Sequence, residues 1–326
     1  MSTPAFARVR TFAFAVAAFV MFDATPSIAA EKVYDPAAGS RWIVETETRG
    51  EEVRPDGTAT SLTRTRAELT IEQKTADGFR ISYVHRGATI EGNARSVPLR
   101  RAYMKVLENV VIRASTDASG KPLRIDNLDE ARDRMRSVAS ELVGQFDQRP
   151  AVRALFDQLT AELIEVDTGH AAAVYLDAPG TLAIAQNTGM KPGEFRQVIK
   201  PAENPLGGDA LKSNVRFELV DADAAGSRLK FVNVTSIDPA ALNEFMNDFA
   251  RSLLAASGDS VTPALVNRLV SSMVFSFDKR AEFDVEDGMT RKVAENSTTV
   301  FRGMEQNLIQ TDARTITVTP APPAAN

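Results

Sequence analysis

The sequence predicts an α+β protein: an antiparallel β-meander, forming a curved sheet or half-barrel, with two helical hairpins packed on it. Two patterns lead to this prediction. In the first and last parts of the chain, apolar residues alternate with polar ones, as they do in strands with one buried face. Elsewhere apolar residues recur every three or four positions, as they do along a helix with one buried side.

The meander is expected to begin at residue 41. Trp42, Val44 and Thr46 share one side of a strand, and Pro55-Asp56-Gly57 predicts the hairpin turn that follows it. A second turn is expected at Asp77-Gly78. The inward positions of the two strands beside that turn are Ala67, Leu69, Ile71, Phe79, Ile81, Tyr83 and His85. A short amphipathic segment at 102–107 and short strands near 110–112 and 123–125 complete this half.

Helical periodicity replaces the strand pattern after residue 128. One apolar stripe consists of Ala131, Met135, Val138, Leu142, Val143 and Phe146. Pro150 separates it from a second stripe over 152–163, so the two predict the first helical hairpin. The segment 169–188 is left open between helix and loop, because Pro179-Gly180 interrupts its helical part.

Strands are expected again at 195–199, 215–219 and 229–234, with a break at 204–208. The clearest helix of the sequence follows, with Asp238 as its N-cap and Pro239 at its first position. Its apolar side consists of Leu242, Phe245, Met246, Phe249, Ala250, Leu253 and Leu254. Gly258 ends this helix and Thr262-Pro263 starts another, which predicts the second hairpin. Strands around an Asp287-Gly288 turn close the chain near residue 318.

The first 29 residues are typical of a signal peptide. Arg8 and Arg10 precede an uncharged run at 11–22, and Ser27-Ile28-Ala29 offers the small residues of a cleavage site. The run is shorter than the ~20 apolar residues of a membrane span, so an uncleaved anchor is the lesser alternative and no transmembrane segment is expected after cleavage. A periplasmic or secreted protein is therefore predicted.

The remaining chain is expected to form one large α+β domain over 30–319. An alternative division has two pseudo-repeated lobes, 30–190 and 191–319, because each block of strands is followed by a helical hairpin. Residues 320–326, rich in Pro and Ala, are expected to form a mobile tail.

Composition narrows the classes of function. Without the three charged residues of the signal segment the formal charge is −6, spread along the chain, which argues against a nucleic-acid partner. The chain contains no cysteine, so it has neither a disulfide nor a thiolate metal site. Stability must come from packing.

No pattern of catalytic or metal-binding residues is found, so no catalytic residue, metal or cofactor is predicted. His85 continues an apolar strand phase and His170 can pair with Asp167 near a helix start. The segment 221–226 imitates the start of a calcium loop, but Val232 stands where the bidentate glutamate belongs. The sequence has no GxSxG elbow and no phosphate loop.

One apolar stripe is a candidate ligand site. Leu242, Phe245, Met246, Phe249 and Leu253 can line an interior that takes a lipid or another apolar ligand, with 204–208 as a flexible rim. Ordinary core packing is the competing interpretation. In outline, over residues 41 to 319, the chain resembles the half-barrel periplasmic carriers of lipoproteins and other lipids, a resemblance of architecture that transfers no functional residue.

The leading hypothesis is an exported, non-catalytic envelope protein that binds a hydrophobic or amphipathic ligand or a partner protein of the envelope. The first alternative is a structural envelope protein with a filled core and no ligand. The second is an exported hydrolase that uses scattered carboxylates, although no pair of them has diagnostic spacing.

Overall fold

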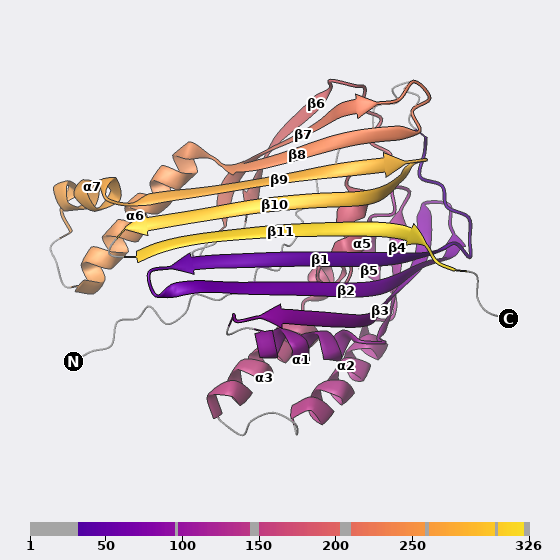
Figure 1. Cartoon of the computed structure of the whole chain (residues 1–326), viewed down its shortest axis with the longest axis horizontal. Coiled ribbons are helices and arrows are strands. Elements are labelled where there is room, and N and C mark those ends of the chain that lie inside the picture. Colours follow the sequence, from indigo (N-terminus) through magenta and orange to yellow (C-terminus); the bar gives the residue numbers. More distant parts are fainter. Residues whose placement is uncertain are drawn as a thin grey trace.

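A single antiparallel sheet organises the molecule. The computed structural model describes residues 32–94, 97–143, 150–202, 210–257, 261–303 and 306–322. The described residues form eleven strands in the order β5-β4-β3-β2-β1-β11-β10-β9-β8-β7-β6, so the sheet is open, with β5 and β6 at its edges (Figure 1). The strands are β1 (Arg41–Arg54), β2 (Gly57–Lys74), β3 (Gly78–Gly92), β4 (Val111–Asp117), β5 (Pro122–Ile125), β6 (Phe195–Ala202), β7 (Leu211–Ala222), β8 (Arg228–Ile237), β9 (Val274–Glu286), β10 (Met289–Gly303) and β11 (Gln306–Pro320).

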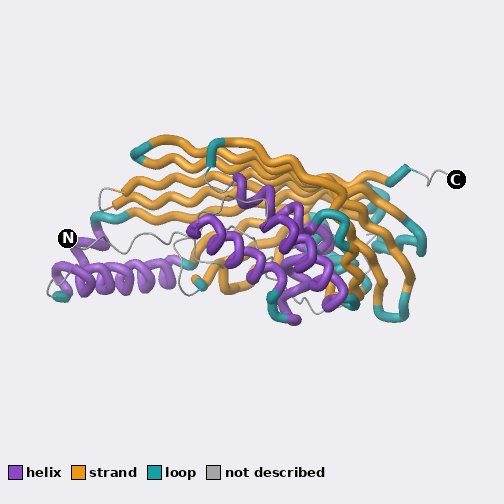
Figure 2. Tube along the Cα trace, turned by 90° about the horizontal axis from the view of Figure 1, so that it is seen from below, coloured by secondary structure: helices purple, strands orange, loops and turns teal. Residues whose placement is uncertain are grey.

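Seven helices accompany the sheet in the described residues. They are α1 (Val97–Leu107), α2 (Leu128–Val143), α3 (Pro150–Ile164), α4 (Thr168–Tyr175), α5 (Asp177–Ala183), α6 (Pro239–Ser257) and α7 (Pro263–Ser271). Figure 2 shows them gathered on one side of the sheet, with the strands curving above them. We call this side the inner face. The predicted α+β class and antiparallel sheet are confirmed, whereas two helical hairpins are not, since α1, α4 and α5 belong to the helical layer as well.

The first strand pairs with the last. β1 and β11 run antiparallel from Trp42 opposite Pro320 to Val53 opposite Ile309. The strands from β1 to β5 form one meander and those from β6 to β11 another, and the β1–β11 ladder joins them. The two blocks of strands therefore share one sheet.

Alternation along the strands builds the main core. Inward residues of β1 to β4 and β7 to β11 pack against α1, α2, α4 and α5, and the largest fully buried side chains include Ile71, Ile112, Phe231, Phe283 and Ile316. Phe217 stacks on Phe231 with ring centroids 5.2 Å apart and meets Phe283 edge-on at 6.0 Å. Burial of these side chains stabilises the fold in proportion to the apolar area removed from water.

A second, smaller cluster lies where α6 and α7 meet the strands. Its buried members are Leu211, Ile237, Met246, Ala250, Val266, Met273, Phe275 and Phe301. The same strands contribute to both clusters, because inward positions nearer one end of β9, β10 and β11 belong to the main core and those nearer the other end to this cluster.

The predicted turns and caps are largely confirmed. Asp287 and Gly288 have φ of 50° and 79°, as the turn between β9 and β10 requires. A Cβ at Gly288 would lie 2.6 Å from the carbonyl oxygen of Lys32, so only glycine fits there. Asp238 and Thr262 cap α6 and α7, since their side chains accept hydrogen bonds from the backbone N–H groups of Ala241 and Leu265.

The open assignment of 169–188 resolves into two helices. The break falls at Leu176, and Pro179-Gly180 lies inside α5. Proline is tolerated there because the first turn of a helix has no intrahelical acceptor for its N–H groups. The predicted signal peptide, Phe146, the rim at 204–208, Gly258 and the last four residues of the tail lie outside the described residues.

The core assignment makes a first prediction. Phe283 is 0% exposed, and its replacement by alanine is expected to lower the free energy of unfolding by about 3–5 kcal/mol, because the ring leaves a cavity that its neighbours cannot fill. Phe195 on edge strand β6 is the matched control: its side chain is 50% exposed, so Phe195→Ala should cost far less. Denaturant titration of both variants makes the comparison, and equal losses would contradict this assignment.

Candidate ligand-binding surface

The apolar side of α6 lies over the inner face of the sheet. Asp238 starts the helix directly after β8, and Leu242, Phe245 and Phe249 then point to the strands. Met246 and Ala250 are buried, whereas Leu242, Phe245, Phe249, Leu253 and Leu254 are only partly buried. The sheet therefore covers this side of α6 incompletely.

Four phenylalanine rings form the centre of this region, which we call the aromatic cluster: Phe245, Phe249, Phe275 and Phe301. Phe245 and Phe249 lie one helical turn apart and stack with ring centroids 5.9 Å apart. Phe275 of β9 lies 6.2 Å from Phe245, and Phe301 of β10 meets Phe249 edge-on at 6.2 Å. Two rings from the helix thus meet two rings from the sheet.

Six charged side chains and one amide side chain cross the inner face next to the aromatic cluster. We call these the polar belt: Arg100 of α1, Asp177 of α5, Asn233 of β8, Lys279 of β9, Glu295 of β10, and Asp312 and Arg314 of β11. On β9 the inward sequence is Phe275, Phe277, Lys279, so Lys279 lies about 13 Å from Phe275 along the strand. The polar belt separates the aromatic cluster from the main core.

The polar belt is held by an ion-pair network around Arg314. Its guanidinium donates to a carboxylate oxygen of Asp177 and, at 3.2 Å, to Glu295. The other oxygen of Glu295 lies 3.0 Å from the Lys279 ammonium. Side chains of Arg314 and Glu295 are 15% and 11% exposed, whereas those of Asp177 and Lys279 are 26% and 29% exposed. The network is therefore buried at its centre and reaches the surface at Asp177 and Lys279.

The two carboxylates of this network differ in acidity. Burial alone would raise the pKa of Glu295, but the adjacent charges of Lys279 and Arg314 outweigh it and the pKa lies below its ordinary value. Burial raises the pKa of Asp177 despite the charge of Arg314. Burial likewise raises the pKa of Asp312, while Gln310 donates a hydrogen bond of 2.8 Å to its carboxylate. Glu295 is thus the more firmly ionised partner of Arg314.

Two acceptor atoms of the polar belt lack a partner. Asp177 Oδ1 and Asn233 Oδ1 are inaccessible to solvent, and no described group donates a hydrogen bond to either. A buried acceptor without a donor costs about 1–3 kcal/mol. The strand register places Asn233 opposite Ala281, Ala281 opposite Glu295, and Glu295 opposite Arg314. Asn233 therefore lies in one row with Glu295 and Arg314, and Asp177 reaches the end of that row from α5 through its contact with Arg314.

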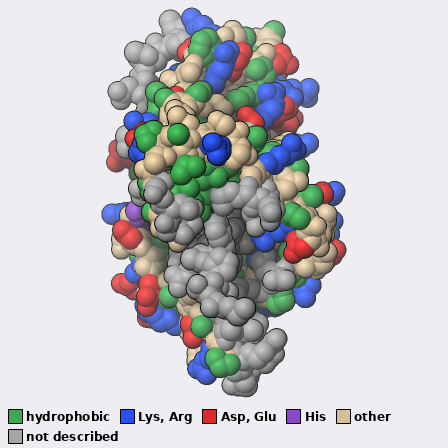
Figure 3. All heavy atoms as spheres, turned by 90° about the vertical axis from the view of Figure 1, so that its left-hand side faces the viewer, with side chains coloured by type: hydrophobic (Ala, Val, Ile, Leu, Met, Phe, Trp, Pro, Cys, Tyr) green, Lys and Arg blue, Asp and Glu red, His purple; other side chains and the backbone are tan. Residues whose placement is uncertain are grey.

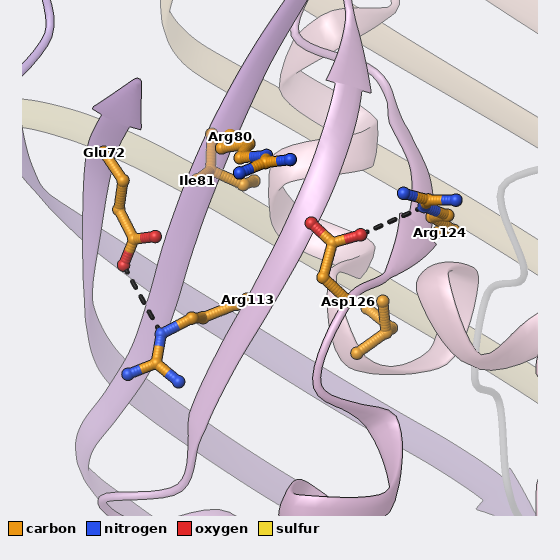
Figure 4. Close-up of a pocket in the computed structure, with 7 residues that line it drawn as sticks. Glu72, Arg80, Ile81, Arg113, Arg124 and Asp126 are labelled. Atoms are coloured by element: carbon orange, nitrogen blue, oxygen red, sulfur yellow. Dashed lines mark hydrogen bonds and ion pairs between the residues drawn. The ribbon is translucent and has the colours of Figure 1, made fainter. Parts of the chain in front are cut away.

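A separate hollow of about 550 Å³ lies at the other end of the sheet, by β2 to β5 (Figure 4). Its lining carries Arg80, Arg113 and Arg124, and also Glu72 and Asp126. Figure 4 shows two of these arginines paired with acids: Arg113 lies 3.7 Å from Glu72, and Arg124 lies 3.0 Å from Asp126. Because its acids already neutralise two of the three cations, this hollow offers a ligand little unpaired charge.

The surface around α6 and α7 is mixed. Figure 3 shows this end of the molecule, where hydrophobic side chains reach the surface in a patch in the upper half of the view, with basic and acidic side chains beside and above it. Among the described helices, none combines the length and apolar character that a membrane span needs. Nor do the described residues bring three His, Asp or Glu side chains together as a metal ion would require.

The five predicted site residues fall into two groups. Leu242, Phe245, Phe249 and Leu253 are partly buried along one side of α6, while Met246 is 5% exposed and packs inside the second cluster. The aromatic partners from the sheet were not predicted as site residues. Neither was the polar belt, although Lys279, Glu295 and Arg314 occupy the apolar phase of their strands, and charges in that phase are the signal that could have revealed it.

Both histidines lie where the sequence placed them. His85 is on β3, edge-on to Tyr83 with ring centroids 5.1 Å apart, and its Nδ1 has no partner. His170 Nδ1 lies 3.5 Å from Asp167, whose side chain caps α4 through the Gly169 N–H. The segment 221–226 covers the end of β7 and most of the turn to β8, in which Asp223 accepts from the N–H of Ser227 at 2.7 Å.

Comparison with known proteins gives no family. No protein-family model matches the chain, and no curated protein matches its sequence. Among solved structures, lipovitellin, whose structure describes its lipid–protein interactions, is 7% identical with a TM-score of 0.43, over 89% of this chain and 26% of its own. This chain thus spans about a quarter of that one.

Two further solved structures are also similar in part. OpdL of Pseudomonas aeruginosa is 8% identical with a TM-score of 0.20, over 86% of this chain and 98% of its own. An outer membrane channel from Pseudomonas putida F1 is 8% identical with a TM-score of 0.17, over 91% of this chain and the whole of its own. Since all three TM-scores lie below 0.5, these likenesses support no assignment.

The ion-pair network makes a second prediction. Glu295→Gln is expected to lower the free energy of unfolding by about 3 kcal/mol or more, because Arg314 and Lys279 lose a buried counter-charge. Asp248→Asn is the control, since Asp248 pairs with Arg251 at 3.2 Å on the surface of α6, where ion pairs contribute little. Denaturant titration at pH 7 tests both, and similar losses in the two variants would show that the network is solvated.

The partly buried histidine of β3 makes a third prediction, about pH. Burial lowers the pKa of His85 from 6.5 to about 4. Between these values the unfolded chain binds a proton that the folded protein does not, so acidification favours unfolding. The stability contributed by neutral His85 is complete above about pH 6.5 and falls by about 1–3 kcal/mol on the way to pH 4.

His85→Phe tests this directly, because it removes the titrating group and keeps an aromatic ring beside Tyr83. Its unfolding free energy, measured between pH 7 and pH 4, should fall less steeply than that of the wild type. His170→Phe is the control, since the His170 side chain is 72% exposed and its loss should leave the slope unchanged. A slope that persists in His85→Phe would assign the acid sensitivity to other groups.

Proposed function

We propose that the protein binds a hydrophobic or amphipathic ligand at the aromatic cluster, without catalysing a reaction on it, in the periplasm or outside the cell. The observation that carries the proposal is the incomplete cover of α6. Phe245, Phe249 and Leu242 remain partly exposed although they face the sheet. Large apolar side chains left partly open to water at the inner face of a sheet mark a surface on which an apolar ligand gains by burial.

The contrast with the main core supports this site. There the large inward side chains, such as Phe231, Phe283 and Ile71, are sealed from solvent. At the aromatic cluster Met246 and Ala250 are buried, whereas Phe245 and Phe249 meet rings of the sheet and still remain partly exposed. The large side chains are thus sealed from solvent in one part of the inner face and partly exposed in the other.

The adjoining polar belt supports an amphipathic ligand rather than a purely apolar one. A molecule that lies along β9 would meet apolar rings at Phe275 and Phe277 and charged groups from Lys279 onward. The carboxylates nearby are engaged in ion pairs, since Asp177 and Glu295 both accept from Arg314. This arrangement favours binding over hydrolysis by a pair of free carboxylates.

Further parts of the proposal come from the sequence alone. Residues 1–29 form a cleaved signal peptide, and 30–319 form the exported domain. An envelope protein partner is the alternative occupant of the same surface. A structural envelope protein without a ligand is the competing function, and the binding experiment below separates the two.

The fourth prediction is a binding measurement. A fluorescent undecanoic acid whose emission depends on polarity should bind the wild type and shift its emission to shorter wavelength. The double variant Phe245→Ala/Phe249→Ala should bind at least about tenfold more weakly, because it loses two aromatic contact surfaces of the site. Circular dichroism and thermal unfolding establish that this variant is folded.

Phe195→Ala provides the matched control. Phe195 is a partly exposed ring on β6, where Arg216 lies 4.1 Å above it. Its loss should leave probe affinity unchanged. Failure of the wild type to bind the probe, or equal affinity in the double variant, would favour the structural protein without a ligand or a site elsewhere.

A further inference from the structure

The polar belt has the composition of a head-group site. Its three acids, Asp177, Glu295 and Asp312, are balanced by Arg100, Lys279 and Arg314, so its formal charge is zero. Their side chains are largely removed from solvent, and Arg100 and Asp312 interact electrostatically. A ligand with a net charge would leave one charge unpaired in this poorly solvated place, which is unfavourable. An uncharged head group leaves the balance intact.

The unpartnered atoms define what such a head group must offer. Asp177 Oδ1 and Asn233 Oδ1 are both acceptors, and both are buried without a donor. Only a group with O–H or N–H donors satisfies them. Hydroxyl groups supply donors without adding charge, and a head group with several of them can serve one acceptor on helix α5 and another on strand β8.

The neighbouring residues on the inner face suit such a group. Ala281 stands between Asn233 and Glu295 in the strand register and is buried in the main core. Lys279 and Ser297 pair opposite each other in the next row towards the aromatic cluster. Lys279 has N–H groups beyond the one that Glu295 accepts. The two rows together therefore offer donors as well as acceptors, as hydroxyl groups require.

We propose that the polar belt binds the uncharged, polyhydroxyl head group of an amphipathic ligand, a sugar or glycerol, while the aromatic cluster holds its chain. This inference rests on the proposed function, because it names the chemical class of the ligand at the same surface. Asp177 and Asn233 accept hydrogen bonds from the hydroxyl groups. The distance of about 13 Å along β9 between Phe275 and Lys279 lets one molecule contact both regions.

The test compares ligands that share a twelve-carbon chain and differ in their head. Dodecyl maltoside and glycerol monolaurate present hydroxyl groups, dodecanoate presents a charged acceptor, and dodecyltrimethylammonium presents a charge without donors. Each displaces the fluorescent undecanoic acid from the wild type at concentrations below its micelle formation. The two hydroxyl-bearing ligands should bind at least about tenfold more tightly than the two charged ones. Tighter binding of dodecyl maltoside than of glycerol monolaurate would indicate a sugar head group, and the reverse would indicate a glycerol head group.

Two variants locate the preference. Asp177→Asn keeps an oxygen for Arg314 and replaces an acceptor with an N–H donor, so it should weaken hydroxyl-bearing ligands about tenfold and leave dodecanoate unweakened. Asn233→Leu removes the second acceptor without any change of charge and should also reduce the preference for hydroxyl-bearing ligands over charged ones. This variant provides the test if Asp177→Asn does not fold. Asn296→Leu is the control, because Asn296 is exposed on the opposite face of β10 and its loss should change nothing.

The outcomes separate the two proposals. If no twelve-carbon ligand displaces the probe and the probe itself does not bind, the proposed function fails. If all four bind equally, or the preference survives in both Asp177→Asn and Asn233→Leu, the apolar site stands and the head-group assignment is wrong. Tighter binding of either charged ligand would also overturn the assignment.

Discussion

The pairing of β1 with β11 is the constraint on which the rest of the structure depends. Every other neighbouring pair in the sheet lies within one of the two meanders, whereas this ladder joins the beginning of the described chain to its end. It brings Val44 opposite Val318 and Thr48 opposite Arg314. The main core extends through this junction, and so does the polar belt, in which Arg100 from one half faces Asp312 from the other. Without this ladder neither would be continuous.

Local chemistry accounts for most of what the sequence predicted correctly. Turns and helix caps depend on residues a few positions apart, so a single sequence shows them. Examples are the turns at Pro55-Asp56-Gly57 and Asp287-Gly288 and the caps Asp238 and Thr262. Strand order depends on contacts between residues more than 250 positions apart, and nothing in the periodicity specifies them. The helices outside the two predicted hairpins, α1, α4 and α5, show the same limit of local patterns. In α5, for example, Pro179 indicates a break in the sequence, but the helix accommodates it in its first turn.

The sequence predicts only part of the candidate site, again because local patterns do not specify packing or strand register. The apolar side of α6 follows from its 3.6-residue period, but how completely the sheet covers that side is a property of packing. Lys279, Glu295 and Arg314 each stand two residues from an inward apolar side chain, which marks them as inward charges. Their mutual pairing follows from the register of three strands, and Asp177 joins them from a helix whose position no local pattern predicts.

The open edges of the sheet bear on how copies of the protein meet. An exposed edge strand presents unpaired N–H and C=O groups on which a strand of another molecule could assemble. Here one edge is β5, only four residues long and started by Pro122, and the other is β6, which carries Lys200 and Pro201 near its end. Proline lacks the N–H that a pairing strand needs, and a lysine on an edge disfavours stacking of identical chains. A sheet eleven strands wide can thus remain open without templating fibrous growth.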